Sequence, residues 1–334
     1  MTRVAAVDCG TNSIRLLVAD VPVPTDGAGP VGLVDLHREM RVVRLGEGVD
    51  RTGRLSDAAL ERVRVALVDY SAISRALAVE TTRLVATSAT RDATNRQDFV
   101  DLVTGVLGVV PEVVAGGEEA QLSYDGATRG LDRADGPFLV VDIGGGSTEV
   151  ALGAASQVLG TSAVPATPAV LASLSVDIGC VRLTERHLAG DPPTAAQIAA
   201  AQADVDAALT RVLAVVPAAR ARTVVALAGT VTTIAALALD LPGYDPERIH
   251  LSRITADQVR EVTSRLLAMT RAERAALPVM HEGRADVIGG GALVLRSLVD
   301  RLDLTDVLVS EADILDGIAW SAAARHRTHH NGAA

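Results

Sequence analysis

Short apolar runs alternate along the chain with longer stretches in which apolar residues recur every three or four positions. The short runs are rich in Val, Ile and Leu, which favours buried strands. They cover residues 4–8, 15–20, 83–88, 138–142, 149–152, 223–227 and 306–309. The longer stretches predict helices, one capped by Ser56 and others over residues 194–216, 256–269 and 284–302. This alternation is typical of an α/β fold.

One short motif occurs twice. Residues 7–13 read Val-Asp-Cys-Gly-Thr-Asn-Ser, and residues 141–147 read Val-Asp-Ile-Gly-Gly-Gly-Ser. Each copy lies between two apolar strands, and Asp8 and Asp142 are 134 residues apart, about one domain length. The repeat predicts a duplicated actin-like, ribonuclease H-like fold with two domains around a cleft. The alternative is a pair of unrelated hairpin turns.

The domain boundary follows from this repeat, because no low-complexity linker divides the chain. The 334 residues suffice for two domains. We expect the first domain to contain residues 1–124 and 306–334, since duplicated folds of this kind cross over twice. The second domain is then expected to contain residues 125–305.

Both turns combine glycine, small residues and serine, which suits phosphate binding. Glycine permits a tight turn and a close approach to a ligand, and the N–H groups of such a turn form an anion-binding nest. The predicted phosphate-binding residues are Gly10, Thr11, Asn12, Ser13, Gly144, Gly145, Gly146 and Ser147. We expect both turns to grip one phosphate chain.

Gly229 and Thr230 are a third candidate contact, because they follow a strand and open a helix. The N–H groups at a helix start point towards anions. A simple strand-to-helix turn explains these two residues equally well.

Three carboxylates beside the turns suit a metal bound to phosphate. Asp8, Asp142 and Glu149 supply the oxygen ligands that Mg²⁺ prefers, with Mn²⁺ as the alternative cation. The competing interpretation of the two aspartates is that they cap the turns through their own side chains. The competing interpretation of Glu149 is a solvent-exposed position on a strand.

Arginine is the expected phosphate-binding cation. Arg91 follows the strand at 83–88 and is predicted to project from a strand-to-helix loop towards phosphate oxygens, with a catalytic role. Its alternative is a surface ion pair with Asp92 or Asp98. By position alone, the further candidates for a local positive surface are Arg15, Arg129 and Arg182.

The amino-acid composition excludes several classes of protein. All 31 basic residues are arginines, so a Walker A loop, a Schiff-base enzyme and a lysine general base are excluded. With 41 acidic residues, two Phe, three Tyr and one Trp, the chain lacks the basic surface and stacking residues of a nucleic-acid binder. Neither a signal peptide nor a membrane span is expected, so we predict a cytoplasmic protein without a membrane partner.

Eight segments, the two turns among them, resemble the Ppx/GppA (exopolyphosphatase / guanosine pentaphosphate phosphohydrolase) family of the sugar kinase/actin superfamily. They occur in order along nearly the whole chain. The segments are Asp8-Cys9-Gly10-Thr11-Asn12-Ser13, Ala86-Thr87-Ser88-Ala89-Thr90-Arg91-Asp92-Ala93, Gly117-Glu118-Glu119-Ala120, Asp142-Ile143-Gly144-Gly145-Gly146-Ser147-Thr148-Glu149, Gly179-Cys180-Val181-Arg182-Leu183-Thr184-Glu185, Ala228-Gly229-Thr230-Val231-Thr232-Thr233, Arg284-Ala285-Asp286-Val287-Ile288 and Ser310-Glu311-Ala312-Asp313. Thr11 departs from the family pattern, in which Ser is commoner. The larger relatives carry an extra C-terminal helical domain, so short polyphosphate chains are the expected substrate here.

The resemblance also identifies a base. Glu118 and Glu119 stand at a predicted helix start, and the residues alone leave open which one faces substrate or whether both only favour the helix dipole. The family pattern implies that Glu119 is the catalytic glutamate that activates water.

The implied function is Mg²⁺-dependent removal of the terminal phosphate of inorganic polyphosphate, or of guanosine pentaphosphate (pppGpp). One alternative is an ATP-dependent small-molecule kinase of the same superfamily, with Gly289, Gly290 and Gly291 as its adenosine-facing turn. Another is a non-catalytic sensor that binds alarmone nucleotides. We also expect a homodimer.

Overall fold

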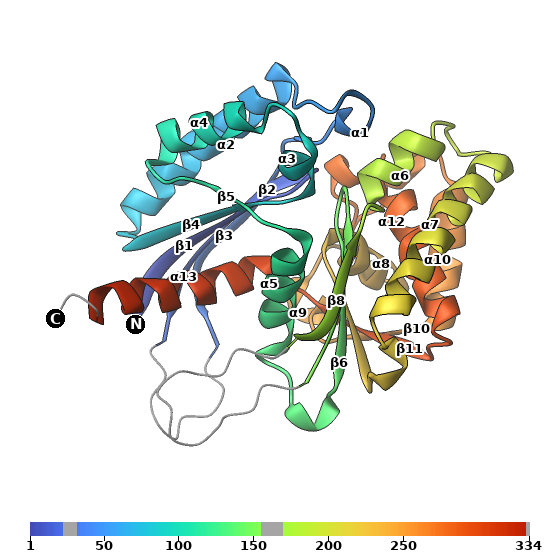
Figure 1. Cartoon of the computed structure of the whole chain (residues 1–334). Helices are drawn as coiled ribbons and strands as arrows, with labels where there is room; N and C mark the ends of the chain where they lie inside the picture. Colours follow the sequence, from blue (N-terminus) through green and yellow to red (C-terminus); the bar gives the residue numbers. More distant parts are fainter. Residues whose placement is uncertain (23–31, 155–169, 332–334) are drawn as a thin grey trace. The chain divides into compact units, whose positions relative to one another are not determined.

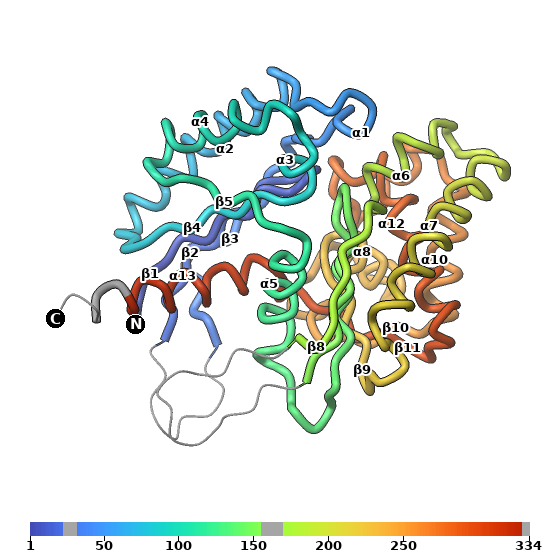
Figure 2. The backbone as a smooth tube through the Cα atoms, in the orientation of Figure 1, coloured from blue at the N-terminus to red at the C-terminus, as the bar shows by residue number. Residues whose placement is uncertain are grey.

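The computed structural model describes residues 1–22, 32–154 and 170–331. Two compact units account for these residues, and each is described by itself (Figures 1 and 2). Unit 1 contains Met1–Asp132 and the chain from Asp313 onward, and unit 2 contains Arg133–Ala154 and Val170–Ala312. The boundary expected after Tyr124 falls inside the helix α5 (Gly116–Thr128), which lies wholly in unit 1.

Unit 1 is built on a mixed sheet that, in the described part of the chain, has five strands in the order β3-β2-β1-β4-β5. The strands are β1 (Thr2–Cys9), β2 (Ser13–Val21), β3 (Val34–Val42), β4 (Thr81–Ala86) and β5 (Glu112–Val113). The first three are antiparallel neighbours, whereas β4 runs parallel to β1 and β5 parallel to β4. The strands expected at 4–8, 15–20 and 83–88 are confirmed, with ends shifted by up to two residues.

Helices cover both faces of this sheet, because successive side chains of a strand point to opposite sides. Ala5 and Val7 of β1 pack with α2 (Asp57–Ala76) and α4 (Arg96–Leu107). Val4 packs on the other face with α13 (Ile314–Asn331), which Figure 2 traces along the first strands. Ser56 caps α2 as predicted, accepting the Ala59 N–H at 3.2 Å. The remaining helices of unit 1 are α1 (Val49–Thr52) and α3 (Ser88–Asp92).

Unit 2 repeats this arrangement in a sheet of order β10-β11-β9-β6-β7-β8 among the described residues. The strands are β6 (Phe138–Ile143), β7 (Thr148–Gly153), β8 (Val170–Val176), β9 (Thr223–Leu227), β10 (Arg253–Thr255) and β11 (Asp306–Ser310). As in unit 1, three antiparallel neighbours are followed by a parallel strand, β9, beside the first of them. The chain therefore has the duplicated actin-like α/β fold that the repeat predicts.

The strand β11 corrects one detail of the expected domains. Residues 306–334 were expected to add both a strand and a helix to the first domain. Instead, β11 pairs in parallel with β9 in unit 2, where Val307 and Val309 join the apolar core. Of the two elements expected from residues 306–334, only α13 packs on the sheet of unit 1 (Figure 1). An apolar strand pattern does not specify which of two sheets the strand joins.

Seven helices of unit 2 are described. They are α6 (Cys180–His187), α7 (Ala195–Val215), α8 (Gly229–Ala238), α9 (Pro246–Ile249), α10 (Ala256–Ala268), α11 (Arg271–Ala275) and α12 (Ile288–Arg301). Capping boxes at Thr194 and Thr255 start α7 and α10 where helices were predicted. The helix expected from residue 284 starts only at Ile288, because Glu282–Arg284 form a separate 3₁₀ turn. Among the described residues, no helix has the length and apolar character that crossing a membrane requires.

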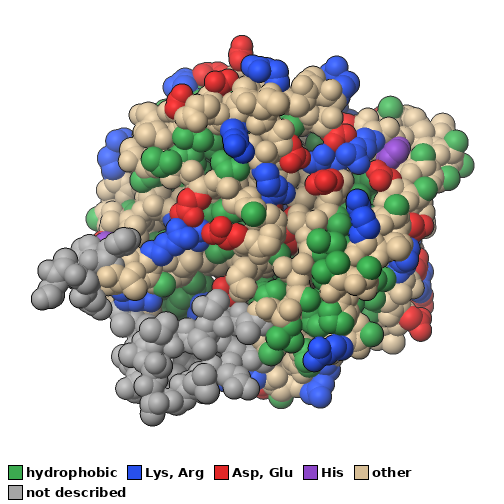
Figure 3. Space-filling view, viewed as in Figure 1, with side chains coloured by type: hydrophobic (Ala, Val, Ile, Leu, Met, Phe, Trp, Pro, Cys, Tyr) green, Lys and Arg blue, Asp and Glu red, His purple; other side chains and the backbone are tan. Residues whose placement is uncertain are grey.

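Many arginines pair with carboxylates, most of them at the surface and one, Arg83, from a buried position. Arg3 and Asp20, Arg83 and Glu112, and Arg260 and Asp300 each approach to 2.8 Å. On the face shown in Figure 3, basic and acidic side chains are interspersed. Arginine thus serves ordinary ion pairing here as well as the site described below, as expected for a chain without lysine.

We predict that Asp125 makes folding stability depend on pH. Burial raises the pKa of Asp125 from 3.8 to about 6, although Arg129 and the hydrogen bond from Gln121 oppose the shift. Because the folded protein then holds this proton more tightly than the unfolded chain, the stabilisation is complete below pH 3.8 and is lost as the pH rises through about 6.

The variant Asp125→Asn has no such proton. Between about pH 4 and pH 8, the wild type should lose about 2 kcal/mol of unfolding free energy relative to Asp125→Asn. Urea unfolding of both proteins at the two pH values measures this difference. Identical pH dependence in both proteins would contradict the prediction.

Candidate active site

The two predicted phosphate turns have the same backbone geometry. In unit 1 the turn joins β1 to β2, and the Gly10 N–H donates to the Ser13 carbonyl at 3.0 Å. In unit 2 it joins β6 to β7, and the Gly144 N–H donates to the Ser147 carbonyl, also at 3.0 Å. The repeated motif is therefore a repeated structure, which excludes two unrelated turns.

The start of α6 holds the carbonyl oxygens of the second turn. The donors are the N–H groups of Cys180 and Val181 and the Arg182 Nε. They bond to the carbonyl oxygens of Gly144, Gly145 and Gly146 at 3.0, 2.9 and 2.7 Å, respectively. In a trans peptide the N–H points opposite to the C=O. The next N–H groups, those of Gly145, Gly146 and Ser147, are therefore directed away from α6, as an anion-binding nest requires.

The segment after β3 holds the first turn in a similar way. The Gly46 N–H donates to the Thr11 carbonyl at 2.8 Å, and the Arg44 N–H donates to the Asn12 carbonyl at 2.8 Å. The N–H groups of Asn12 and Ser13 consequently point away from this segment. Each turn thus presents N–H groups on one side because its carbonyl oxygens have protein donors on the other.

A hydroxyl pair connects the first turn to the helix α3, whose Arg91 contacts Glu119. The Thr11 and Ser88 hydroxyl oxygens are 2.8 Å apart, and Ser88 begins α3. Arg91 on α3 donates to Glu119 Oε2 at 2.9 Å and to the Val114 carbonyl at 3.1 Å. The expectation that Arg91 lies in a loop is wrong, because the residues after β4 wind into a short helix at once.

The two adjacent glutamates differ in their surroundings. Glu119 is 6% exposed and contacts the Arg91 guanidinium. The Glu118 side chain is 45% exposed and pairs with Arg83 at 2.8 Å. Glu119 is therefore the buried carboxylate of the two, whereas Glu118 is largely exposed and pairs with the buried Arg83.

Asp142 and Glu149 form a pair of carboxylates in unit 2. They are opposite each other on β6 and β7, and both are buried. Ser175 Oγ on β8 donates to Glu149 Oε1 at 2.6 Å. The alternative of a solvated strand position for Glu149 is therefore wrong. Two neighbouring buried carboxylates suit a divalent cation.

Arg15 occupies in the first turn the position that Glu149 has in the second. Its guanidinium donates to Asp8 Oδ2 at 2.7 Å from one terminal nitrogen and contacts Asp313, which precedes α13, from the other. Burial raises the pKa of Asp8, and Arg15 opposes this shift. Asp8 Oδ1 is buried without a hydrogen-bond partner among the described residues. The role of Asp313 was missed because its place beside Asp8 depends on the return of α13 to unit 1.

The third candidate contact lies at the start of α8. This helix begins at Gly229, and Thr230 is buried. An Arg284 terminal nitrogen donates to the Gly229 carbonyl at 3.3 Å and to Thr233 Oγ1 at 3.2 Å. A guanidinium beside the positive end of a helix dipole favours an anion there. Arg284 was not predicted as a site residue, although its segment carries the family resemblance.

Two other predicted features, Arg129 and the glycine run at 289–291, make packing contacts within their own units. Arg129 lies over the Trp320 ring, 4.7 Å from its centroid. The glycine run at 289–291 lies inside α12, and a Cβ on Gly290 or Gly291 would be 2.7 Å from the Cys180 carbonyl or 2.5 Å from Thr230 Oγ1. The run thus lies in the first turn of α12, the helix start that the kinase alternative expected, and it packs closely against α6 and α8.

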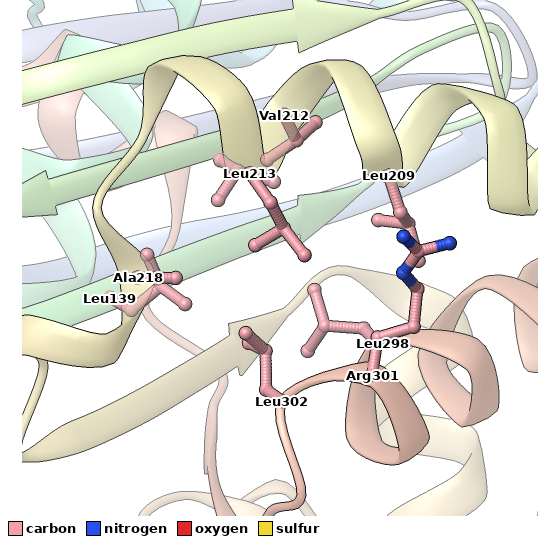
Figure 4. Close-up of a pocket in the computed structure, with 9 residues that line it drawn as sticks. Leu139, Leu209, Val212, Leu213, Ala218, Leu298, Arg301 and Leu302 are labelled. Carbon is pink, nitrogen blue, oxygen red and sulfur yellow. The ribbon is translucent and has the colours of Figure 1, made fainter.

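A small pocket opens elsewhere in unit 2 (Figure 4). Its walls include Leu209 and Val212 of α7, Leu298 of α12, and the charged side chain of Arg301. The predicted site residues do not line it, so it is distinct from the turns.

The two similar sheets, each with the same glycine-containing turn between its first two strands, define a protein of the duplicated actin-like class. The model of the Ppx/GppA phosphatase family matches residues 25–326, and the chain belongs to this family. It is 50% identical to Exopolyphosphatase 2 of Mycobacterium tuberculosis over 97% of this chain and 99% of that protein.

Two solved structures show the same fold. The crystal structure of an exopolyphosphatase-like protein matches with a TM-score of 0.88 at 42% identity, over 97% of this chain and 99% of the other. A Ppx/GppA family member from Aquifex aeolicus matches with a TM-score of 0.76 at 28% identity, over 97% and 98% of the two chains.

Proposed function

We propose that this enzyme is an exopolyphosphatase that hydrolyses the terminal phosphoanhydride of inorganic polyphosphate, with a preference for short chains. The observation that carries the proposal is the buried Glu119, held by Arg91 on the helix that Thr11 and Ser88 connect to the first phosphate turn. The similarity to Exopolyphosphatase 2 over nearly the full length of both proteins supports the same activity.

The reaction needs donors for the phosphate oxygens and a group that orients water. The N–H groups of the two turns bind the phosphate oxygens in fixed directions, which stabilises charge that develops in the transition state. Gly229 and Thr230 add the third phosphate contact. Glu119 orients the attacking water and accepts its proton, and Arg91 holds that carboxylate in place.

A divalent cation, Mg²⁺ or Mn²⁺, fits the donor set. No group of three or more His, Cys, Asp and Glu side chains suited to a metal occurs in the part of the chain that the structure describes. Mg²⁺ is commonly held by one or two carboxylates together with phosphate oxygens and water. Asp142 and Glu149 are the proposed ligands, and Asp8 is the weaker one because Arg15 already neutralises it. When bound, the cation supplies positive charge at the phosphate oxygens.

Guanosine pentaphosphate is the second candidate substrate. It ends in a phosphoanhydride of the same chemical kind, so the same donors and base act on it, and relatives of this chain are named for either substrate. A cytoplasmic location and a homodimer stay predictions from the sequence.

The base assignment predicts different effects for two neighbouring substitutions. Glu119→Gln should lower kcat by about 10²- to 10⁴-fold on tripolyphosphate, because the amide no longer accepts a proton. Glu118→Gln is the matched control and should retain activity, because that side chain is largely exposed and pairs with Arg83. Phosphate release from tripolyphosphate and guanosine pentaphosphate measures both variants and ranks the two substrates. Equal activities of the two variants would exclude Glu119 as the base.

The metal assignment predicts a changed requirement for Mg²⁺. Chelation should abolish wild-type activity, and Glu149→Gln should raise the Mg²⁺ concentration for half-maximal activity by at least about tenfold. Glu261→Gln, an exposed substitution on α10, is the control. A normal Mg²⁺ titration for Glu149→Gln would remove Glu149 from the proposed ligands.

A further inference from the structure

Each phosphate turn is in close contact with a glycine at which a side chain would have no room. In unit 1 it is Gly46, in the segment after β3, and in unit 2 it is Gly179, in the segment after β8. The turns are related by an offset of 134 residues and the two glycines by 133. The glycines therefore occupy nearly equivalent places in the repeat.

Gly46 lies against the side chain of Thr11. A Cβ on Gly46 would be 2.2 Å from Thr11 Cγ2 and 3.2 Å from Ala89 Cβ. Non-bonded carbon atoms ordinarily stay about 3.5–4 Å apart, so Thr11 would have to shift. Thr11 is the residue whose carbonyl accepts the Gly46 N–H and whose hydroxyl bonds to Ser88. The shift would disturb both the turn and its connection to α3.

Gly179 lies against the backbone of the second turn. A Cβ there would be 2.4 Å from the Gly145 carbonyl oxygen and 2.7 Å from the Gly146 nitrogen. No change of side-chain rotamer relieves such an overlap. The start of α6 would have to move away from the turn, which would break the bonds from the Cys180 and Val181 N–H groups.

We propose that Gly46 and Gly179 are positioning residues for the two phosphate turns. Each glycine lets protein donors reach the carbonyl oxygens of its turn, so that the N–H groups of the turn are directed at phosphate. This inference rests on the proposed function, because it takes the turns to bind the phosphates of the substrate.

Because the two overlaps involve different atoms, a second substitution should rescue one alanine variant and not the other. The overlap at Gly46 is mainly with one methyl group, which Thr11→Ser removes while the hydroxyl stays. The overlap at Gly179 is with backbone atoms, so no such compensating substitution exists. Thr11→Ser should therefore rescue Gly46→Ala and should not rescue Gly179→Ala.

The experiment compares Gly46→Ala and Gly179→Ala with Gly105→Ala in unit 1 and Gly243→Ala in unit 2. An added Cβ meets nothing within 4 Å at either control position. Steady-state kinetics with tripolyphosphate, calorimetric binding of tripolyphosphate and thermal unfolding are measured for each. We expect kcat/KM to fall by about 10²-fold in the two test variants, with weaker tripolyphosphate binding. Both controls should behave as the wild type.

The rescue distinguishes positioning from mere structural damage. Gly46→Ala/Thr11→Ser should recover the kcat/KM and the affinity of Thr11→Ser alone. The proposal is overturned if Gly46→Ala matches Gly105→Ala in both quantities, or if the double variant stays as impaired as Gly46→Ala. If Gly179→Ala does not fold, the comparison of the Gly46 variants alone supports or overturns the proposal.

A different result would contradict the proposed function without deciding the role of the two glycines. A wild-type protein that releases no phosphate from tripolyphosphate or guanosine pentaphosphate would contradict the activity. The binding measurements on the glycine variants would still test whether the turns hold a phosphate chain.

Discussion

A planar trans peptide directs its N–H and its C=O in opposite directions, and the candidate site depends on this constraint. A turn can present consecutive N–H groups to a phosphate only if its carbonyl oxygens find donors on the other side, since a buried carbonyl without a partner is costly. In unit 2 the first residues of α6 supply these donors, and in unit 1 the segment after β3 does so. The fold thus determines the direction of the N–H groups before any substrate binds, which is the preorganisation that catalysis by fixed dipoles requires.

The two halves share this backbone arrangement but differ in charge. At equivalent positions opposite the turn aspartates, unit 1 has Arg15 and unit 2 has Glu149. Asp8 is therefore neutralised within unit 1, whereas Asp142 gains a second carboxylate as its neighbour. We propose that Asp142 and Glu149 of unit 2 are the cation ligands and that Glu119 of unit 1, held by Arg91, is the base.

Local sequence was enough to predict the hairpins, most strands and the capped helices. The Asp-x-Gly turn between two apolar runs is a short-range signal, and its repetition at a fixed offset predicts the duplicated fold. Ser56 caps its helix for the same local reason. The edge strand β3 was missed because its charged residues, among them Arg38 and Glu39, hide the strand pattern.

The sequence pattern could not predict features that depend on tertiary contacts. Arg15 and Asp313 meet although they are 298 residues apart. The pattern of residues alone does not distinguish the two adjacent glutamates; the family resemblance implied Glu119, and burial separates it from Glu118. Likewise, Gly46 and Gly179 are ordinary loop glycines until the turns that they touch are known.

The central claim is that both turns bind one phosphate chain through their N–H groups. Amide NMR spectra recorded during titration with tripolyphosphate and Mg²⁺ test it most directly. The account predicts that the amide signals of Asn12, Ser13, Gly145 and Gly146 shift together with a single dissociation constant. Shifts confined to one turn, or separate constants for the two, would contradict it.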